Sequence, residues 1–353
     1  MALPLIELVE NAHRAAQARL GIAAALLASS SFPSSTSGKA VPTGDWSTLA
    51  SEQVLELREL SAQLMQSYYQ FARWIETGYS LGAPLDGEGV RTGDDLRESF
   101  LARVRAANDL QDSSTELGRD LAAALRGNKN HPLNRLVVGT DELESASLPD
   151  REVRADAFNF PRIENGNAAR AAIRKMLQNA AQPDVRLARS LSGATTPEEI
   201  LKATQDALRA SGDAGGGKAD GLVMRAGRSL ADYVHQRDKR IQMYARGTGS
   251  NPCAFCAMLA SRGFIYWSAT SATKTYRDGG LNSYHDNCHC FPIVRWVRTS
   301  ELPAANKYFK DNWSAVTEDY DGKEKLKAWR RWLNQKRRDA RSGDRTNQNG
   351  VSQ

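Results

Sequence analysis

The sequence predicts a mainly α-helical protein, with an elongated helical N-terminal region and a small α+β domain held together by a Cys/His cluster of the zinc type. Apolar residues recur at helical spacing in several long segments before residue 245. All four cysteines of the 353-residue chain lie in one stretch of its C-terminal half, beside two aromatic and β-branched segments that favour strands, residues 264–268 and 291–297. We expect three parts: residues 1–165, 166–298 and 299–353.

Two long helices are expected in the N-terminal part, over residues 3–29 and 51–78. The segment between them, residues 30–45, is rich in Ser, Pro and Gly and is expected to be a linker. In the second helix, apolar residues repeat at spacings of three and four, namely Leu57, Leu60, Leu64, Tyr68, Phe71 and Ile75. Its aromatic end is expected to belong to the core rather than to form a partner-binding stripe.

The middle of the chain predicts further helices joined by loops. After a glycine-rich loop at 78–95 comes a helix over 96–126, with a break near 112–114. Residues 128–161 are mixed, and only 136–138 suggest a short strand. A helix follows at 168–181. Thr196 and Glu199 form the pattern of a capping box, with Pro197 at the first helical position, so a helix should run from there to 210. Another is expected over 222–245.

Residues 212–218, GDAGGGK, resemble a phosphate-binding loop without its last position. That position is Ala219, where a Ser or Thr would bind magnesium. The segment also follows a predicted helix, whereas a phosphate-binding loop follows a strand. We therefore interpret these residues as a flexible linker.

A metal site is predicted where the cysteines gather. A Cys-x2-Cys pair followed by His-x2-Cys-x-Cys is the spacing that a tetrahedral site needs, and the candidate ligands are Cys253, Cys256, His285, Cys288 and Cys290. On an extended backbone His289 points away from its two cysteine neighbours. Zinc suits thiolate and imidazole ligands, and a full ligand set indicates a structural role. Disulfides or reduced core thiols are the alternatives, but no secretory signal is visible and cytosolic thiols stay reduced.

The same stretch resembles a known family. Residues 253–263 (CAFCAMLASRG) and 284–290 (YHDNCHC) are similar to the C-terminal domain of phage Mu F-like minor capsid (head morphogenesis) proteins, in the actinobacteriophage branch also labelled capsid maturation protease. That family has an Arg-rich helix before its first cysteine pair, which would begin here at Asp238. Asp286 and His289 stand where the commoner form has Pro and Arg. The resemblance covers residues 238–294.

The net charge of +6 is concentrated near the C-terminus. Residues 323–345 hold ten Lys or Arg and three acids, so the rest of the chain is close to neutral. A local basic helix with interleaved Trp favours contacts with nucleic acid, because its charge is so concentrated; the alternative is a solvated helix that docks its tryptophans on the protein body. The expected DNA-binding residues are Lys323, Lys325, Lys327, Arg330, Arg331, Lys336, Arg337, Arg338 and Arg341. Residues 342–353 are expected to be disordered.

The resemblance implies a minor capsid protein that acts in procapsid assembly at the portal, in the host cytoplasm, and ends inside the virion head. Residues 1–165 would contact portal protein, scaffold or major capsid protein, and the basic tail would contact packaged phage DNA. The longest apolar run, residues 21–28, is too short to span a membrane.

Two alternatives remain. One is a capsid maturation protease that cleaves scaffold or major capsid protein, although no Gly-x-Ser-x-Gly motif is present and His131 and His235 are expected at the surface. The other is a zinc-containing DNA-binding or nicking module, for which His285, Asn287 and His289 lie too close together to supply separate structural and catalytic groups.

Overall fold

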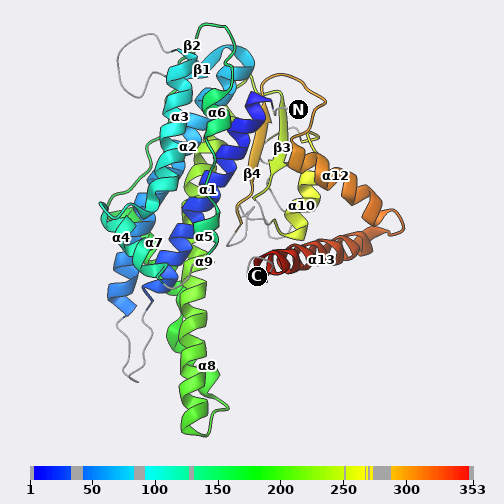
Figure 1. Cartoon of the computed structure of the whole chain (residues 1–353). Helices are drawn as coiled ribbons and strands as arrows, with labels where there is room; N and C mark the ends of the chain where they lie inside the picture. The colour runs from blue at the N-terminus through cyan, green and yellow to red at the C-terminus, as the bar shows by residue number, and fades with distance from the viewer. Residues whose placement is uncertain are drawn as a thin grey trace. The chain divides into compact units, whose positions relative to one another are not determined.

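The protein is described by a computed structural model over residues 4–32, 43–82, 92–126, 131–249, 252–266, 268, 271–272 and 288–349. The fold is mainly α-helical with few strands, as the sequence predicts (Figure 1). The chain forms two compact units. The first unit comprises residues 1–239 and 284–289, and the second comprises residues 240–283 and 290–353. These boundaries differ from the sequence-based division after residues 165 and 298.

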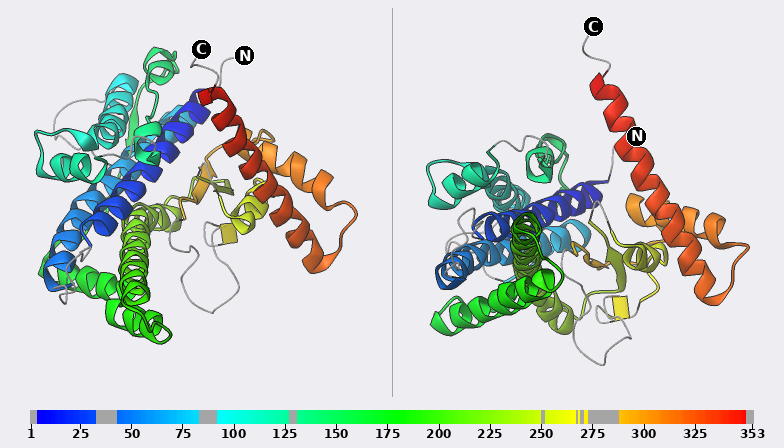
Figure 2. Two further views of the ribbon diagram at one scale, coloured as in Figure 1. Left: turned by 60° about the horizontal axis from the view of Figure 1, so that its bottom comes forward. Right: turned by 90° about the horizontal axis from the view of Figure 1, so that it is seen from below.

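Three long helices form the centre of the first unit: α1 (Leu5–Ser30), α2 (Thr43–Thr77) and α9 (Pro197–Arg237). They pack against one another, and both Figure 1 and Figure 2 show α1 lying beside α9. The aromatic end of α2 belongs to the core, because Tyr68, Phe71 and Trp74 are at most 1% exposed. This confirms the interpretation of that run as core.

Helix α9 corrects the interpretation of residues 212–218 as a flexible linker. The helix starts at the predicted capping box, in which Thr196 accepts from the Glu199 amide, and it continues without interruption through the glycines. Glycine is disfavoured in a helix interior, but here it allows close packing. A Cβ atom at Gly216 would lie 2.6 Å from the Ala25 carbonyl oxygen of α1, and one at Gly215 would lie 2.8 Å from the Trp46 ring. The glycines are therefore needed for contact between helices.

Shorter elements surround these three helices. The predicted break near 112–114 is present, between η1 (Asp109–Gln111) and α4 (Glu116–Ala124). The predicted strand at 136–138 is wrong, because those residues are irregular and the strand instead lies at 154–156, paired in parallel with β1 (Tyr79–Leu81). The elements are β1 (Tyr79–Leu81), α3 (Gly93–Asn108), η1 (Asp109–Gln111), α4 (Glu116–Ala124), α5 (Pro132–Arg135), α6 (Asp141–Ser145), β2 (Arg154–Asp156), α7 (Asn167–Ala181) and α8 (Pro183–Leu191).

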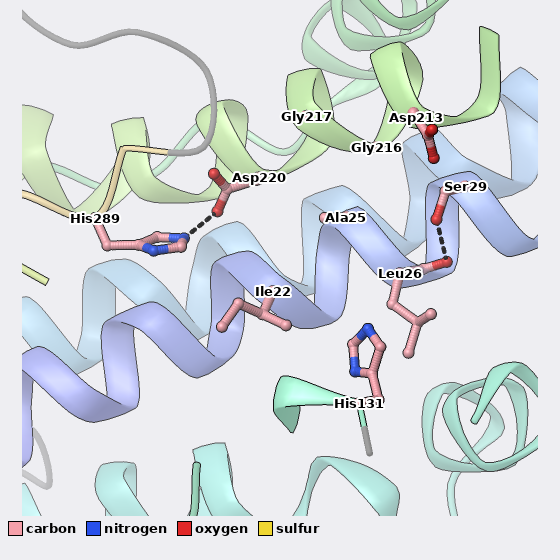
Figure 3. A pocket seen from close by; sticks show the side chains of 10 residues that line it. All are labelled: Ile22, Ala25, Leu26, Ser29, His131, Asp213, Gly216, Gly217, Asp220 and His289. Carbon is pink, nitrogen blue, oxygen red and sulfur yellow. Dashed lines mark hydrogen bonds and ion pairs between the residues drawn. The ribbon is translucent and has the colours of Figure 1, made fainter. Parts of the chain in front are cut away.

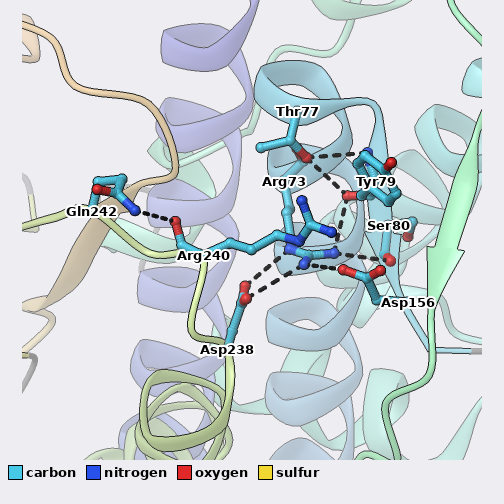
Figure 4. A network of polar contacts seen from close by, with 8 residues as sticks. All are labelled: Arg73, Thr77, Tyr79, Ser80, Asp156, Asp238, Arg240 and Gln242. Carbon is cyan, nitrogen blue, oxygen red and sulfur yellow. Dashed lines mark hydrogen bonds and ion pairs between the residues drawn. The ribbon is translucent and has the colours of Figure 1, made fainter.

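A buried arginine connects three parts of the first unit. Arg73 of α2 is 1% exposed, forms an ion pair with Asp156 of β2, and forms a second with Asp238 after α9, at 3.0 Å (Figure 4). It also donates to the backbone carbonyl of Ser80 at 3.1 Å. Because a buried charge is stable only when it is paired and hydrogen-bonded, these contacts fix the ends of α2, β2 and α9 together.

Among the described residues, the second unit contains a two-stranded antiparallel sheet and the helices α10 (Ala254–Ser261), α12 (Ala304–Thr317) and α13 (Gly322–Asn349), besides a short helical piece at 271–272. The strands are β3 (Met243–Gly247) and β4 (Phe291–Arg295). The helices share an apolar cluster that contains Ala257, Phe309, Trp329 and Leu333. The indole nitrogen of Trp329, which is fully buried, donates to the Ala254 carbonyl at 3.0 Å.

Several predictions for the C-terminal half are wrong in detail. The helix expected over 222–245 ends at Arg237. The Arg-rich helix expected from Asp238 is not formed, because residues 238–242 are not helical and residues 243–247 form β3. Of the strand expected at 264–268, the described residues (264–266 and 268) form one bridge, between Tyr266 and Tyr244. Helix α13 extends through 342–349, where disorder was expected, whereas 350–353 lie outside the described residues. The strand expected at 291–297 is confirmed as β4.

Candidate metal centre and basic helix

Three buried cysteines form a group that could hold a metal ion. The sulfur atoms of Cys256, Cys288 and Cys290 all lie within 4.8 Å of one another, and each residue is at most 3% exposed. Zinc–sulfur bonds of about 2.3 Å in a tetrahedron place sulfurs roughly 3.8 Å apart, so the observed group fits such an ion. The structure describes all four cysteines of the chain, and none of them is in a disulfide.

The start of α10 determines how the first cysteine pair is presented. Cys253 is the N-cap residue of α10, and its sulfur accepts from the backbone amide of Cys256 at 3.3 Å. One turn later, Cys256 is directed into the interior, while Cys253 stays half-buried. The sulfur of Cys253 is not among the three that lie together. His285, the fifth predicted ligand, lies outside the described residues.

A buried cation lies beside the cysteine group. Arg246 of β3 is fully buried, and its guanidinium donates to the sulfur of Cys256 at 3.2 Å. The backbone of Arg246 is held in turn by Asn306 of α12, whose side-chain amide donates to the Arg246 carbonyl at 3.0 Å. A positive charge beside a sulfur favours the thiolate, which is the form that binds metals.

Helix α9 holds the segment that carries the second pair of cysteines. The Arg228 guanidinium donates to the backbone carbonyl of Cys288, and Asp220, two turns earlier, pairs with the Nε2 atom of His289 at 2.8 Å (Figure 3). The pairing agrees with the expectation that His289 points away from its cysteine neighbours. Gly21 of α1 makes room for this pair, because a Cβ atom there would lie 2.0 Å from the Asp220 carboxylate.

Of the three histidines outside the cysteine stretch, His13 is fully buried, and His131 and His235 are half-buried. Burial, with a further contribution from the Arg14 charge, lowers the pKa of His13 to about 3, and its ring stacks on Tyr68 at 4.3 Å. Burial likewise lowers the pKa of His235 to about 3, and its Nε2 lies 2.5 Å from the Tyr69 hydroxyl. Partial burial lowers the pKa of His131, whose ring accepts from the Leu133 amide. His131 and His235 were expected at the surface, and both are in fact half-buried.

Helix α13 buries Trp329, whereas Trp332 is half-buried with the Lys336 ammonium 5.9 Å from its ring centroid. Trp329 is buried against α10, and Trp332 stacks on it at 4.8 Å between ring centroids. Lys325 and Arg337 are half-buried, Arg337 donates to the Pro252 carbonyl, and the side chain of Arg341 lies outside the description. The remaining predicted DNA-binding residues are exposed: Lys323, Lys327, Arg330, Arg331, Lys336 and Arg338. Trp329 therefore stacks on another side chain of the protein, Trp332, and not on a nucleic-acid base.

The comparisons with known proteins give one match. Residues 160–316, less than half of the chain, match the family model described as VG15 protein, which points to a family of viral proteins. No curated protein and no solved structure matches. The matched range contains α9, the cysteine group and β4, but not α13. None of the helices in the described part of the chain is long and apolar enough to cross a bilayer.

Proposed function

We propose that this chain is a phage minor capsid protein that acts in procapsid assembly at the portal. The observation that carries the proposal is the cysteine group. Cys256, Cys288 and Cys290 come from the two motifs whose spacing resembles the Mu F-like family, and their sulfurs converge within a segment that matches a viral family. Cys256 and Cys288 are 32 positions apart in the sequence and lie together in the interior. A metal ion bound by both cysteine motifs needs this arrangement.

The group is proposed to hold zinc in a structural role. Cys256, Cys288 and Cys290 would supply three ligands, and Cys253 or His285 would supply the fourth. An ion bound in this way would connect α10 to the segment before β4 and stabilise the fold around them. Arg246 would offset part of the negative charge that three thiolates bring to the site.

Helix α13 is proposed to contact packaged DNA through the phosphate backbone alone. Its exposed cations lie at 323, 327, 330, 331, 336 and 338, while Trp329 is held in the apolar cluster and is not available to stack on bases. Contacts of this kind depend strongly on salt and carry no sequence information.

The assembly role is tested by co-expression with the portal, scaffold and major capsid proteins of the same phage. We expect the chain to co-sediment with procapsids, and to do so only when portal protein is present. A variant in which Cys256 and Cys288 are both Ser should lose this association, whereas Ser145→Ala on the exposed end of α6 should not. Absence of the wild-type chain from procapsids and purified virions would contradict the proposal.

The same preparation separates the protease alternative. Defined cleavage of scaffold or major capsid protein, dependent on this chain, would show a maturation protease instead. Metal-dependent nicking of supercoiled DNA by the purified chain would favour the nicking module.

A further inference from the structure

A groove of about 610 Å³ lies against α2 in the first unit. One wall is formed by residues 59, 62, 63 and 66 of α2, which share one face of the helix because they are three or four positions apart. The other wall is formed by residues 158–163 and Asn165, and Leu230 of α9 adds an apolar surface. The groove contains no residue of the cysteine group, so the inference drawn from it goes beyond the proposed assembly role and does not depend on it.

The main chain of the second wall has no hydrogen-bond partner of its own. Residues 157–165 form neither helix nor strand, and their backbone N–H and C=O groups bond to no other residue in the described part of the chain. Pairing with β1 ends just before them, at Asp156. The segment is accessible, because Ala157, Asn159 and Arg162 are exposed. Backbone groups in this state can bond to the main chain of another polypeptide.

The side chains that face this segment supply further groups that suit a main chain. Gln66 of α2 is half-buried, Asn159 of the second wall is exposed, and neither side chain bonds to another described residue. A carboxamide offers both a donor and an acceptor, as a peptide group does. The Glu59 carboxylate joins the two walls, because it accepts from the Gln63 side chain at 3.3 Å and from the Asn165 side chain at 3.1 Å.

The lining favours an uncharged ligand. It contains one acid and one base, Glu59 and Arg162, so its charges cancel and it gives no advantage to a phosphate or a polyanion. The rings of Phe158 and Phe160 lie 4.8 Å apart between centroids, and Phe158 also meets Tyr233 edge-on. Because these rings already have aromatic partners, the apolar side chains of a peptide suit the groove better than a flat sugar ring does.

We propose that this groove binds an extended, uncharged polypeptide segment of another protein. The main chain of that segment bonds to the backbone of residues 157–165 on one side and to the carboxamides of Gln63 and Gln66 on the other. Its apolar side chains rest against Phe160 and Ile163, which are half-buried. Residues 59 to 66 of α2 span about 10 Å along the helix axis, the length of roughly three residues of an extended strand, so the groove takes a short motif.

Isothermal titration calorimetry on the full chain tests the proposal. The probe is the blocked, uncharged peptide acetyl-Thr-Val-Thr-Val-Thr-amide, and its control is the same peptide with both valine nitrogens methylated. Methylation removes the N–H donors from one edge of the strand and should lower the affinity by about 10-fold or more, the loss expected for one or two hydrogen bonds. Equal affinity for the two peptides, or no heat with either up to about 5 mM, overturns the proposal. Binding of cellopentaose in place of the peptide would show a saccharide site and overturn it too.

One variant and a matched control locate the binding on α2. Gln66→Ala removes a side chain that has no hydrogen bond within the described residues, so the fold should be kept, and peptide affinity should fall by about 5- to 10-fold. Gln205→Ala removes an exposed glutamine of α9 outside the groove and should leave the affinity unchanged. Circular dichroism on both variants checks that they are folded.

Hydrogen exchange locates the binding on the second wall. At a peptide concentration of ten times Kd, the amides of residues 157–165 should exchange about 10-fold more slowly, because they become hydrogen-bonded to the peptide. Exchange in α8 should stay the same. An unchanged exchange rate in residues 157–165, or an unchanged affinity of the Gln66→Ala protein, would refute the assignment to this groove.

Discussion

Adding a single methyl group at Gly216 should push α1 away from α9 and lower the stability of the first unit. The added Cβ would lie 2.6 Å from the carbonyl oxygen of Ala25, whereas ordinary contacts begin at 3.4 Å. The helices must therefore separate locally by about 0.8 Å, because a backbone carbonyl cannot turn aside as a flexible side chain can.

The size of the effect follows from two opposing terms. Overpacking of this kind destabilises by about 1–3 kcal/mol. Replacement of Gly by Ala inside a helix stabilises by about 1 kcal/mol. The net expectation for Gly216→Ala is a loss of about 1 kcal/mol, or a fall of about 2–4 °C in Tm for a unit of this size. If residues 212–218 were a flexible linker, the same change would leave Tm unchanged or raise it.

Thermal and urea unfolding followed by circular dichroism would measure this loss on the full chain. Hydrogen exchange of peptides from α1 and α9 would assign it to the contact between them. Gly193→Ala is the matched control, because a Cβ at that position meets nothing within 4 Å. A Gly216→Ala protein at least as stable as the wild type would show that α1 and α9 are not in close contact there.

The other predictions concern the metal, pH and α13. Elemental analysis should find about one zinc per chain, and Cys288→Ser should lower both the zinc content and Tm; zinc-free protein of full stability would contradict this. Because burial lowers the pKa of His13 to about 3, the neutral ring is favoured in the folded state, and His13 should lower the stability by about 2 kcal/mol between pH 6.5 and pH 5. His235, whose pKa is also lowered to about 3, should contribute a similar fall, so His13→Phe should remove about half of the total. An equal pH dependence of the unfolding free energy in the two proteins would refute the assignment. Trp329→Ala should destabilise the second unit by about 3–5 kcal/mol, seen as a lower urea midpoint. Arg330→Glu should instead leave stability within about 0.5 kcal/mol while it weakens DNA binding in filter assays and reduces its salt dependence; unchanged DNA binding would argue against phosphate contact by α13.

Local signals in the sequence predicted much of the fold. The capping box at Thr196 and the apolar repeat of α2 depend on residues three or four apart, so they can be read without knowledge of the fold. The glycines at 212–217 could not be interpreted in that way. Their composition is typical of a linker, but they are glycines because α1 packs closely against α9 there. The sequence gives no sign of which helix lies opposite.

In the candidate site, too, the residues in local motifs could be predicted and the residues that contact them from distant parts of the sequence could not. Spacing alone identified Cys256, Cys288 and Cys290, because short cysteine motifs have few other uses. The side chains that hold these cysteines in place were missed. Asp220 lies 69 residues from His289, and Arg228 lies 60 residues from Cys288, so no local pattern connects them. Arg246 was missed because a charged residue in the segment MYARG does not suggest a buried strand.

The paired Arg73 has a mechanical consequence. The first unit contains residues 1–239 as one continuous segment, and Asp238 is the next-to-last residue of that segment. Its carboxylate forms an ion pair with the Arg73 guanidinium. A force that pulls on the chain beyond Lys239 would thus have to break the ion pair between Arg73 and Asp238 before the last turn of α9 could unfold. Tension on the chain beyond Lys239 would therefore be carried in part by α2 and β2, through Arg73, and not by the last turn of α9 alone.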